Sequence, residues 1–170
     1  QTLRRAALDI VRTLPGDAST CIGESWELVS LKTEQSRVTE GPLDGQSLRE
    51  LWQGGCLGGS ASGDFPFLVK WVDSHGDLSV QVHPDARACE LLGTGDPKAE
   101  AWYIAHVEPN AHLFLGHHPG LNGETLRFAA QKGTIAKWLY APTPAVGDML
   151  FVPAGMLHAV GAGYLILEVQ

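Results

Sequence analysis

Short apolar or alternating runs, separated by turn signals, fill the chain from Phe65 to its end, and this spacing most constrains the fold. The runs are residues 65–72, 78–83, 101–107, 111–116, 148–152 and 164–169. The chain has 20 glycines and 10 prolines, which supply the turns between them. Short strands at such intervals are typical of an antiparallel sandwich or barrel. The sequence therefore predicts a mainly β fold, a small barrel with a few peripheral helices.

Three segments carry helical signals. Apolar residues at helical spacing predict an N-terminal helix within residues 1–16. Ser47 and Glu50 have the spacing of a capping box and predict a short helix that starts there. A further helix is expected over residues 124–132, as an insertion between two strands. The Gly/Ser-rich stretch 54–64 is typical of a flexible loop.

Length and composition indicate one globular domain. The chain has 170 residues, of which 44% are hydrophobic and 18% charged, and this composition excludes an intrinsically disordered protein. A core of this size needs no disulfide or metal for folding alone. We expect residues 1–170 to form a single domain with the barrel core in residues 65–170.

The charge balance limits the partners. The formal net charge is −7 with neutral histidines, and the chain has no basic stretch, which argues against nucleic-acid binding. The same charge repels an anionic substrate unless local positive charge overcomes it. No apolar run approaches the roughly 18 residues of a membrane span. The three cysteines never form a C-x-x-C pair, so we expect reduced thiols and a cytoplasmic location without a membrane partner.

The run 78–83 carries polar side chains at alternate positions. In a strand, Ser79, Gln81 and His83 share one face, while Leu78 and two valines share the other. An ordinary half-buried strand shows the same pattern when its polar residues face water. The alternation alone therefore leaves two interpretations open, a solvated face and a face that carries a site.

The stretch 147–158 has the pattern G-x5-P-x-G-x2-H. It predicts a strand, a tight turn at Pro153 and Gly155, and a histidine at the start of the next segment. Glycine permits a backbone conformation that other residues resist, so such a turn can aim His158 inward at a fixed point. The alternative is a structural turn with an incidental histidine, because a motif match is a hypothesis.

These two motifs resemble those of the cupin superfamily. The first is a variant, because Gln81 stands where a histidine is usual and Glu100 follows His83 by 17 positions. Seven segments together resemble the type I mannose-6-phosphate isomerases over most of the chain from Gly23 onward: residues 23–28, 41–43, 48–52, 65–70, 78–85, 98–103 and 152–170. The resemblance implies a cupin barrel, that is, a double-stranded β-helix or jelly roll. It also implies an enzyme that interconverts mannose 6-phosphate and fructose 6-phosphate through a cis-enediol.

Residue by residue, the resemblance implies that Gln81, His83, Glu100 and His158 bind one Zn²⁺ per chain. Imidazole and carboxylate groups are good zinc ligands, and a catalytic zinc keeps one position for water or substrate. With one carboxylate and three neutral ligands, the site keeps a net charge of about +1. That charge stabilises the enediol oxygens as a Lewis acid does.

The resemblance also implies that Ser79, Lys70, Lys98 and Trp26 line the sugar-phosphate pocket. Lys98 shares a strand face with Glu100, which gives it a catalytic role beside the metal as well. Lys70 closes an apolar run, an unusual place for a charge. Two structural interpretations stay open: a strand-end Lys70 that reaches water, and a Trp26 that belongs to the core.

Glu168 is the candidate general base. It alternates with Tyr164 and Ile166 on one strand face, ten positions after His158. A carboxylate in a partly closed cavity can both take and return a proton. The alternative is a strand-end carboxylate in solvent. By alternation with the Glu100 strand face, His106 is a further residue expected to approach the cavity.

Members of the family carry, beyond the point that corresponds to Gln170, an S-D-x-T-Y-R motif whose arginine contributes to phosphate and enediolate stabilisation. This motif and the family's Trp-Gly-Gly-type opening do not occur here, so the resemblance implies a compact or truncated form. Two other functions stay open. One is a non-catalytic cupin module that binds metal and sugar phosphate; the other is a two-His, one-carboxylate metal oxygenase. An exposed barrel edge also leaves a homo-oligomer open.

Overall fold

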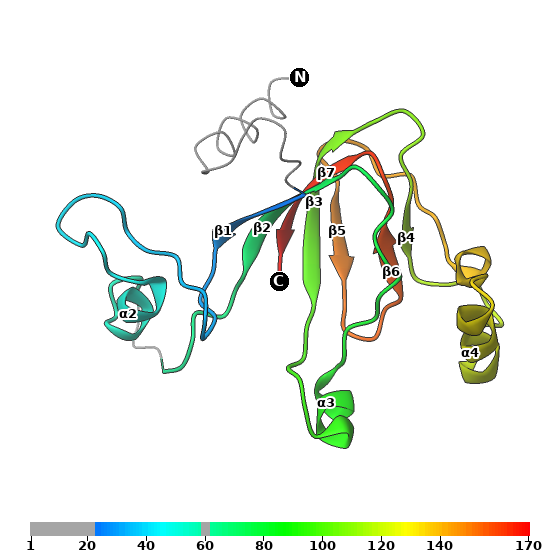
Figure 1. Ribbon diagram of the computed structural model, residues 1–170, viewed down its shortest axis with the longest axis horizontal. Coiled ribbons are helices and arrows are strands. Elements are labelled where there is room, and N and C mark those ends of the chain that lie inside the picture. Colours follow the sequence, from blue (N-terminus) through cyan, green and yellow to red (C-terminus); the bar gives the residue numbers. More distant parts are fainter. Residues whose placement is uncertain (1–22, 59–61) are drawn as a thin grey trace.

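Antiparallel β structure dominates the computed structural model, which describes residues 23–58 and 62–170 (Figure 1). The elements in chain order are β1 (Glu24–Leu28), α2 (Leu48–Gln53), β2 (Val69–Ser74), α3 (Ala86–Leu92), β3 (Glu100–Val107), β4 (Leu113–Leu115), α4 (Gly123–Gln131), the 3₁₀ helix η1 (Ile135–Trp138), β5 (Met149–Val152), β6 (His158–Val160) and β7 (Tyr164–Val169). The helix expected within residues 1–16 and part of the loop 54–64 lie outside the described residues.

Five strands form one antiparallel sheet in the order β1-β2-β7-β3-β5, and β4 pairs with β6 in a second sheet. The apolar core lies between the two sheets. Its buried members are Val72, Trp102, Ile104, Leu113, Val152, Val160, Tyr164 and Ile166. Leu113 and Val160 come from the small sheet and the others from the large one. The helices lie at the periphery, so the predicted mainly β architecture with a few outer helices is confirmed (Figure 1).

The predicted runs locate most of the strands. β7 has the predicted bounds, β3 and β5 differ from the predicted runs by one residue at the first end, and β4 is shorter than its run at both ends. β2 begins at Val69, later than expected, after Pro66, which has no N–H group for a strand ladder. β1 was not predicted, and it forms the edge of the large sheet beside β2.

The run 78–83 is not the regular strand that its alternation predicts. The Leu78 amide donates to the Val160 carbonyl, and Gln81 exchanges two backbone hydrogen bonds with His158 in an isolated bridge. The physical reason is the length of the partner, because β6 has only three residues and cannot support a longer ladder. The segment nevertheless lies along β6, which brings its polar side chains next to the end of the core.

The helices follow their capping signals. Ser47 and Glu50 form both bonds of the predicted capping box at the start of α2. α4 covers nearly the predicted range. α3 was not predicted, although Asp85 caps its first turn and Gly93 ends it with a φ of 66°. None of the helices in the described ranges has the length and apolarity that a membrane crossing requires.

One row of side chains crosses the whole five-stranded sheet on its inner face. Directly opposed residues of antiparallel strands share a face. The register pairs Trp26 with Lys70, Lys70 with Glu168, Glu168 with Trp102, and Trp102 with Leu150. The row therefore places predicted site residues from three separate strands side by side.

The turn between β6 and β7 packs closely against the residue that precedes β4, and this contact can be tested at Gly161. A Cβ atom at Gly161 would lie 2.3 Å from the backbone carbonyl oxygen of His112, which cannot move without shifting β4. We expect Gly161→Ala to lower the free energy of unfolding by about 1–3 kcal/mol, measured by chemical denaturation.

Gly76→Ala is the matched control. It also lies in a turn, its Cβ would meet open space, and its φ lies outside the left-handed region. We expect this variant to stay within about 0.5 kcal/mol of the wild type. Equal losses for the two variants would contradict the close approach at Gly161.

Candidate functional site

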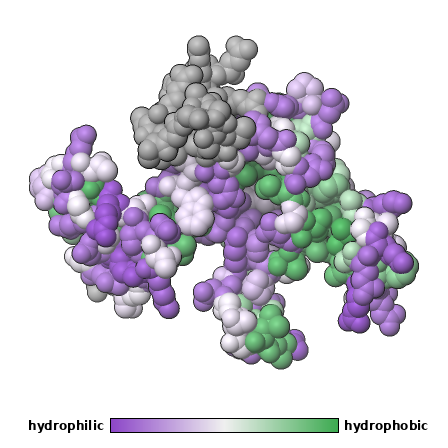
Figure 2. Space-filling view, in the orientation of Figure 1, coloured by the Kyte–Doolittle hydropathy of each residue, from purple (hydrophilic) through white to green (hydrophobic). Residues whose placement is uncertain are grey.

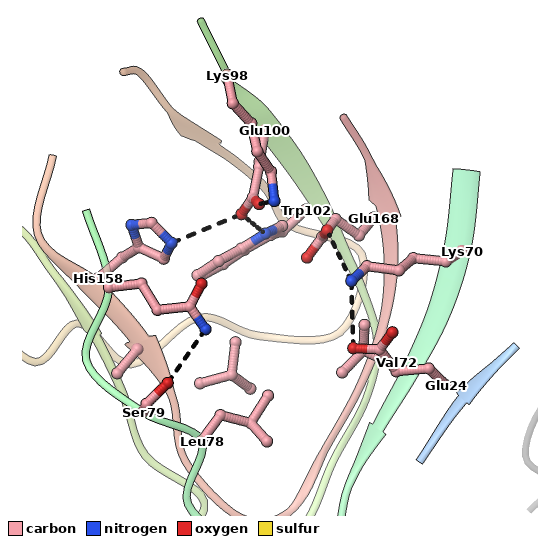
Figure 3. Close-up of a pocket in the computed structure, with 13 residues that line it drawn as sticks. Glu24, Lys70, Val72, Leu78, Ser79, Lys98, Glu100, Trp102, His158 and Glu168 are labelled. Atoms are coloured by element: carbon pink, nitrogen blue, oxygen red, sulfur yellow. Dashed lines mark hydrogen bonds and ion pairs between the residues drawn. The ribbon is translucent and has the colours of Figure 1, made fainter. Parts of the chain in front are cut away.

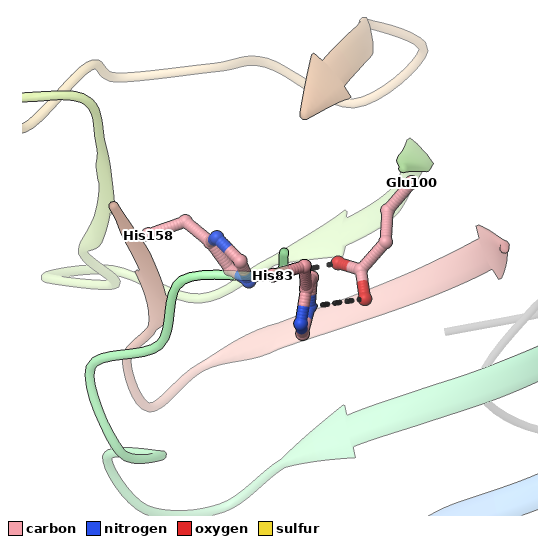
Figure 4. A group of neighbouring side chains, drawn as sticks. All are labelled: His83, Glu100 and His158. Carbon is pink, nitrogen blue, oxygen red and sulfur yellow. Dashed lines mark hydrogen bonds and ion pairs between the residues drawn. The ribbon is translucent and has the colours of Figure 1, made fainter. Parts of the chain in front are cut away.

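His83, Glu100 and His158 form a cluster at one end of the core, with their ligand atoms all within 4.8 Å of one another (Figure 4). His83 Nε2 lies 2.9 Å from Glu100 Oε1, and His158 Nε2 lies 3.8 Å from Glu100 Oε2. His83 precedes α3, while Glu100 and His158 are the first residues of β3 and β6. Three segments far apart in the sequence thus converge on one point.

The predicted turn aims His158 into this cluster. Gly155 has a φ of 83°, and its amide donates to the His83 carbonyl, which ties the turn to the first motif. Nδ1 of His158 lies 2.9 Å from the Met156 carbonyl oxygen, which can only accept. This contact favours the tautomer with the proton on Nδ1, in which Nε2 is the nitrogen that offers a lone pair on the Glu100 side.

Glu100 is buried, with 4% of its surface exposed, yet its carboxylate is well supplied with donors. Lys98 Nζ lies 2.8 Å from Oε1, and Trp102 Nε1 donates to Oε2 at 3.0 Å. Burial raises the pKa of Glu100, but the hydrogen bond and charge of Lys98, together with the two imidazoles, outweigh burial and lower this pKa below its usual value.

Burial and the nearby Lys98 ammonium lower the pKa of His83, against the opposing effect of Glu100. An ionised Glu100 and a neutral His83 are the protonation states that a metal ion requires of its ligands.

A second cluster lies across the sheet, around the ammonium group of Lys70 (Figure 3). Lys70 Nζ lies 3.2 Å from Glu24 Oε1 and 3.4 Å from Glu168 Oε1. The side chains of Lys70 and Glu168 are only 13% and 8% exposed, so neither is the solvated strand-end charge considered above. Burial raises the pKa of Glu24, but hydrogen bonds from Trp26 and Lys70 and the charge of Lys70 outweigh burial and lower this pKa.

Residues of both clusters line a single pocket (Figure 3). The predicted site residues that line it are Lys70, Ser79, Gln81, Lys98, Glu100, His158 and Glu168. His83 contacts this set through Glu100. Gln81 extends its side-chain amide to Ser79, with Nε2 3.4 Å from Oγ. The structure therefore brings eight of the nine predicted residues together.

Trp26 is the predicted site residue that does not line this pocket. It is 45% exposed, so it is not a core tryptophan either. Its indole donates to Glu24 Oε2 at 3.1 Å, and Glu24 does line the pocket. Trp26 thus lies beside the pocket, one contact away from its lining.

Six lining residues were not predicted as site residues, and two of these, Glu24 and Trp102, carry polar groups. Trp102 had a usable signal, because it lies two residues after Glu100 and so shares its strand face. Glu24 lies two residues before Trp26, so it shares the strand face of that predicted residue in the same way. His106 does not line the pocket, because a bulge between Ile104 and His106 interrupts the alternation of β3.

The charges of the pocket nearly balance. Three carboxylates, from Glu24, Glu100 and Glu168, face the two ammonium groups of Lys70 and Lys98. With neutral imidazoles, the lining carries one excess negative charge. The local positive charge that an anionic substrate requires is therefore not supplied by the side chains alone.

The fold and the site define the class of protein, a cupin with a candidate metal site. Within this class, the chain belongs to the type I phosphomannose isomerases, because the model of their catalytic domain matches residues 4–100.

Two proteins of Bacillus subtilis are similar to this chain over most of its length. The chain is 38% identical over 151 residues to a probable mannose-6-phosphate isomerase, GmuF, of Bacillus subtilis, a match that covers 87% of this chain and 48% of the relative. It is 35% identical over 168 residues to the mannose-6-phosphate isomerase ManA of the same organism, covering 97% and 52%.

A crystal structure of a mannose 6-phosphate isomerase from Bacillus subtilis superposes with a TM-score of 0.78 and 34% identity, over 87% of this chain and 48% of that chain. The chain spans about half the length of the curated relatives it matches.

The ion cluster around Lys70 gives a stability test. Among the described residues, Lys70 is the only cation that pairs with Glu168, so Lys70→Met leaves a buried carboxylate without this partner. We expect the free energy of unfolding to fall by about 3 kcal/mol. This is the low end for a buried ion pair that loses one partner, because the side chain of Glu24, the other partner of Lys70, is 42% exposed.

Lys137→Met, at an exposed position of η1, serves as the control and should change stability by less than about 0.5 kcal/mol. A Lys70→Met protein as stable as this control would show that the ion cluster contributes nothing to the fold. Chemical denaturation of both variants measures the difference.

Proposed function

We propose that this chain carries the zinc and substrate site of an isomerase that interconverts mannose 6-phosphate and fructose 6-phosphate. The observation that carries the proposal is the His83–Glu100–His158 cluster, of which Glu100 and His158 are buried and line one pocket with two lysines and Glu168. The names of the relatives support this reaction. Because those relatives are about twice as long, the activity and substrate of the whole protein belong to the proposal.

The residues fit a zinc ion by their chemistry and spacing. His83 Nε2 lies 2.9 Å from one Glu100 oxygen and His158 Nε2 lies 3.8 Å from the other, so nitrogen and oxygen donors of the kinds that zinc binds gather around one point. The hydrogen bond from His158 Nδ1 to a carbonyl is the usual second contact of a metal-binding histidine. Gln81 would complete the set with a neutral amide oxygen, for one zinc per chain.

When bound, Zn²⁺ supplies a Lewis acid for the substrate oxygens and two positive charges, which turn the balance of the pocket from one negative charge to one positive. The phosphate is assigned to the lysines. Two of the three N–H donors of Lys70 face carboxylates, which leaves one for a phosphate oxygen. Ser79 and Lys98 line the same pocket and complete the phosphate and sugar contacts, with Trp26 beside it.

Glu168 is assigned the proton transfer. In the forward direction it takes the proton from C2 of mannose 6-phosphate, which leaves a cis-enediol, and it returns a proton to C1 to give the ketose. The second proton moves from O2 to O1. Burial of Glu168 and its contact with Lys70 hold the carboxylate at a fixed place. Lys98, beside Glu100, is placed to stabilise negative charge that develops on the oxygens.

This proposal includes a cytoplasmic location, in keeping with the free thiols of Cys56 and Cys89. A homo-oligomer stays a prediction; β1 and β5 are the edges of the large sheet where another chain would pair.

Metal removal tests the charge argument. Since the lining alone carries one excess negative charge, we expect the chelator-treated chain to bind mannose 6-phosphate at least about tenfold more weakly than the zinc-loaded chain. Isothermal titration calorimetry at constant ionic strength measures both affinities. Equal affinities would show that the side chains, and not the metal, attract the phosphate.

A coupled assay on mannose 6-phosphate tests the reaction. We expect Glu168→Gln to retain zinc and substrate binding and to lose about 10²–10⁴-fold in turnover, because an amide cannot accept the proton. Lys98→Ala should keep zinc and lose substrate affinity or turnover, whereas His83→Ala should lose the metal.

His118→Ala, outside the described pocket, is the matched histidine control and should keep both zinc and turnover. If the wild-type chain binds zinc and substrate without isomerisation, the enzyme assignment fails and the chain is a binding module. Metal analysis that finds iron in place of zinc would favour the two-His, one-carboxylate alternative.

A further inference from the structure

Trp102 connects the two clusters of the pocket. It is 1% exposed and lies in the apolar core, opposite Glu168 in the register of β3 and β7. Its indole N–H reaches Glu100 Oε2 at 3.0 Å. Its ring meets the His158 ring edge to face, with centroids 5.6 Å apart and an interplanar angle of 72°. One core side chain therefore contacts two of the three clustered ligands.

We propose that Trp102 is a positioning residue of the metal centre, which fixes the rotation of the Glu100 carboxylate and the tilt of the His158 ring. The inference rests on the zinc site of the proposed function. It assigns to Trp102 an effect on metal binding that acts through Glu100 and His158, without contact between the indole and the metal.

The two oxygens of Glu100 have different partners. Oε1 lies 2.8 Å from Lys98 Nζ and 2.9 Å from His83 Nε2, whereas Oε2 accepts from Trp102 and faces His158. The terminal torsion of a glutamate is broad, so a carboxylate held at one oxygen still rotates. The indole N–H holds the second oxygen. It is also a neutral donor, which satisfies Oε2 without adding charge beside a cation site.

The core gives the indole little freedom. Trp102 is flanked in the register by Leu150 on β5 and Glu168 on β7, and it shares the inner face of β3 with Glu100. Buried side chains at native packing density keep one rotamer. The donor position is therefore set by the core before any metal binds, which lowers the reorganisation that metal binding requires.

Trp102→Phe tests this assignment, because it keeps an aromatic ring and removes the N–H donor. We expect the variant to bind Zn²⁺ about 10-fold more weakly in a chelator competition, the lower end for the loss of a contact that orients a ligand. The absorption bands of the Co²⁺-substituted protein should also change, because they report the ligand geometry. Mere loss of core packing would lower thermal stability and leave those bands in place.

Trp52→Phe is the matched control. Trp52 packs edge to face on Phe65, away from the pocket, and its buried Nε1 has no hydrogen-bond partner among residues 23–58 and 62–170. The same substitution there should leave zinc affinity within twofold of the wild type. If Trp102→Phe binds zinc as the control does and keeps the wild-type Co²⁺ bands, the positioning role is wrong.

Two measurements keep the outcomes separate. Stoichiometric zinc binding by the wild-type chain is measured first; no binding there overturns the zinc site and the role of Trp102 together. If Trp102→Phe does not fold, the assigned indole N–H resonance of Trp102 in the wild type replaces it. This resonance should shift on addition of Zn²⁺ while that of Trp52 does not, and an unmoved Trp102 resonance overturns the role.

Discussion

The burial of the Glu100 carboxylate is the constraint on which the site and the meeting of the two sheets depend. An ionised carboxylate withdrawn from water is strongly unfavourable unless charges and donors surround it. Here these come from Lys98, two residues before β3, from Trp102 on β3, and from His83 on a segment 17 residues before Glu100. His158 adds a fourth group from the small sheet. One end of the core is therefore polar, and it holds the segments that carry the candidate ligands.

The second organising feature is the row of residues across the large sheet. Because antiparallel register fixes which side chains stand opposite one another, Lys70 and Trp102 both flank Glu168. The carboxylate proposed as the base thus lies between Lys70 and Trp102 in the register.

Local patterns predicted much of the fold. β7, the capping box of α2 and the turn at Gly155 appear where the sequence places them, because each depends on residues a few positions apart. The run 78–83 departs from its pattern for a non-local reason, the shortness of β6. The same holds for His106, which a bulge in β3 turns away from the pocket.

By itself, the sequence determined the donor chemistry of the site: two histidines, a glutamate and a glutamine in strand-like phase, with lysines and Glu168 on faces that alternation defines. Resemblance to the family joined these residues into one set. Only the tertiary structure decided the partners, such as Lys70 between Glu24 and Glu168, or the indole of Trp102 against His158. The physical reason is that alternation along a strand fixes the face a side chain occupies, whereas the strand that lies beside it depends on the packing of the whole chain.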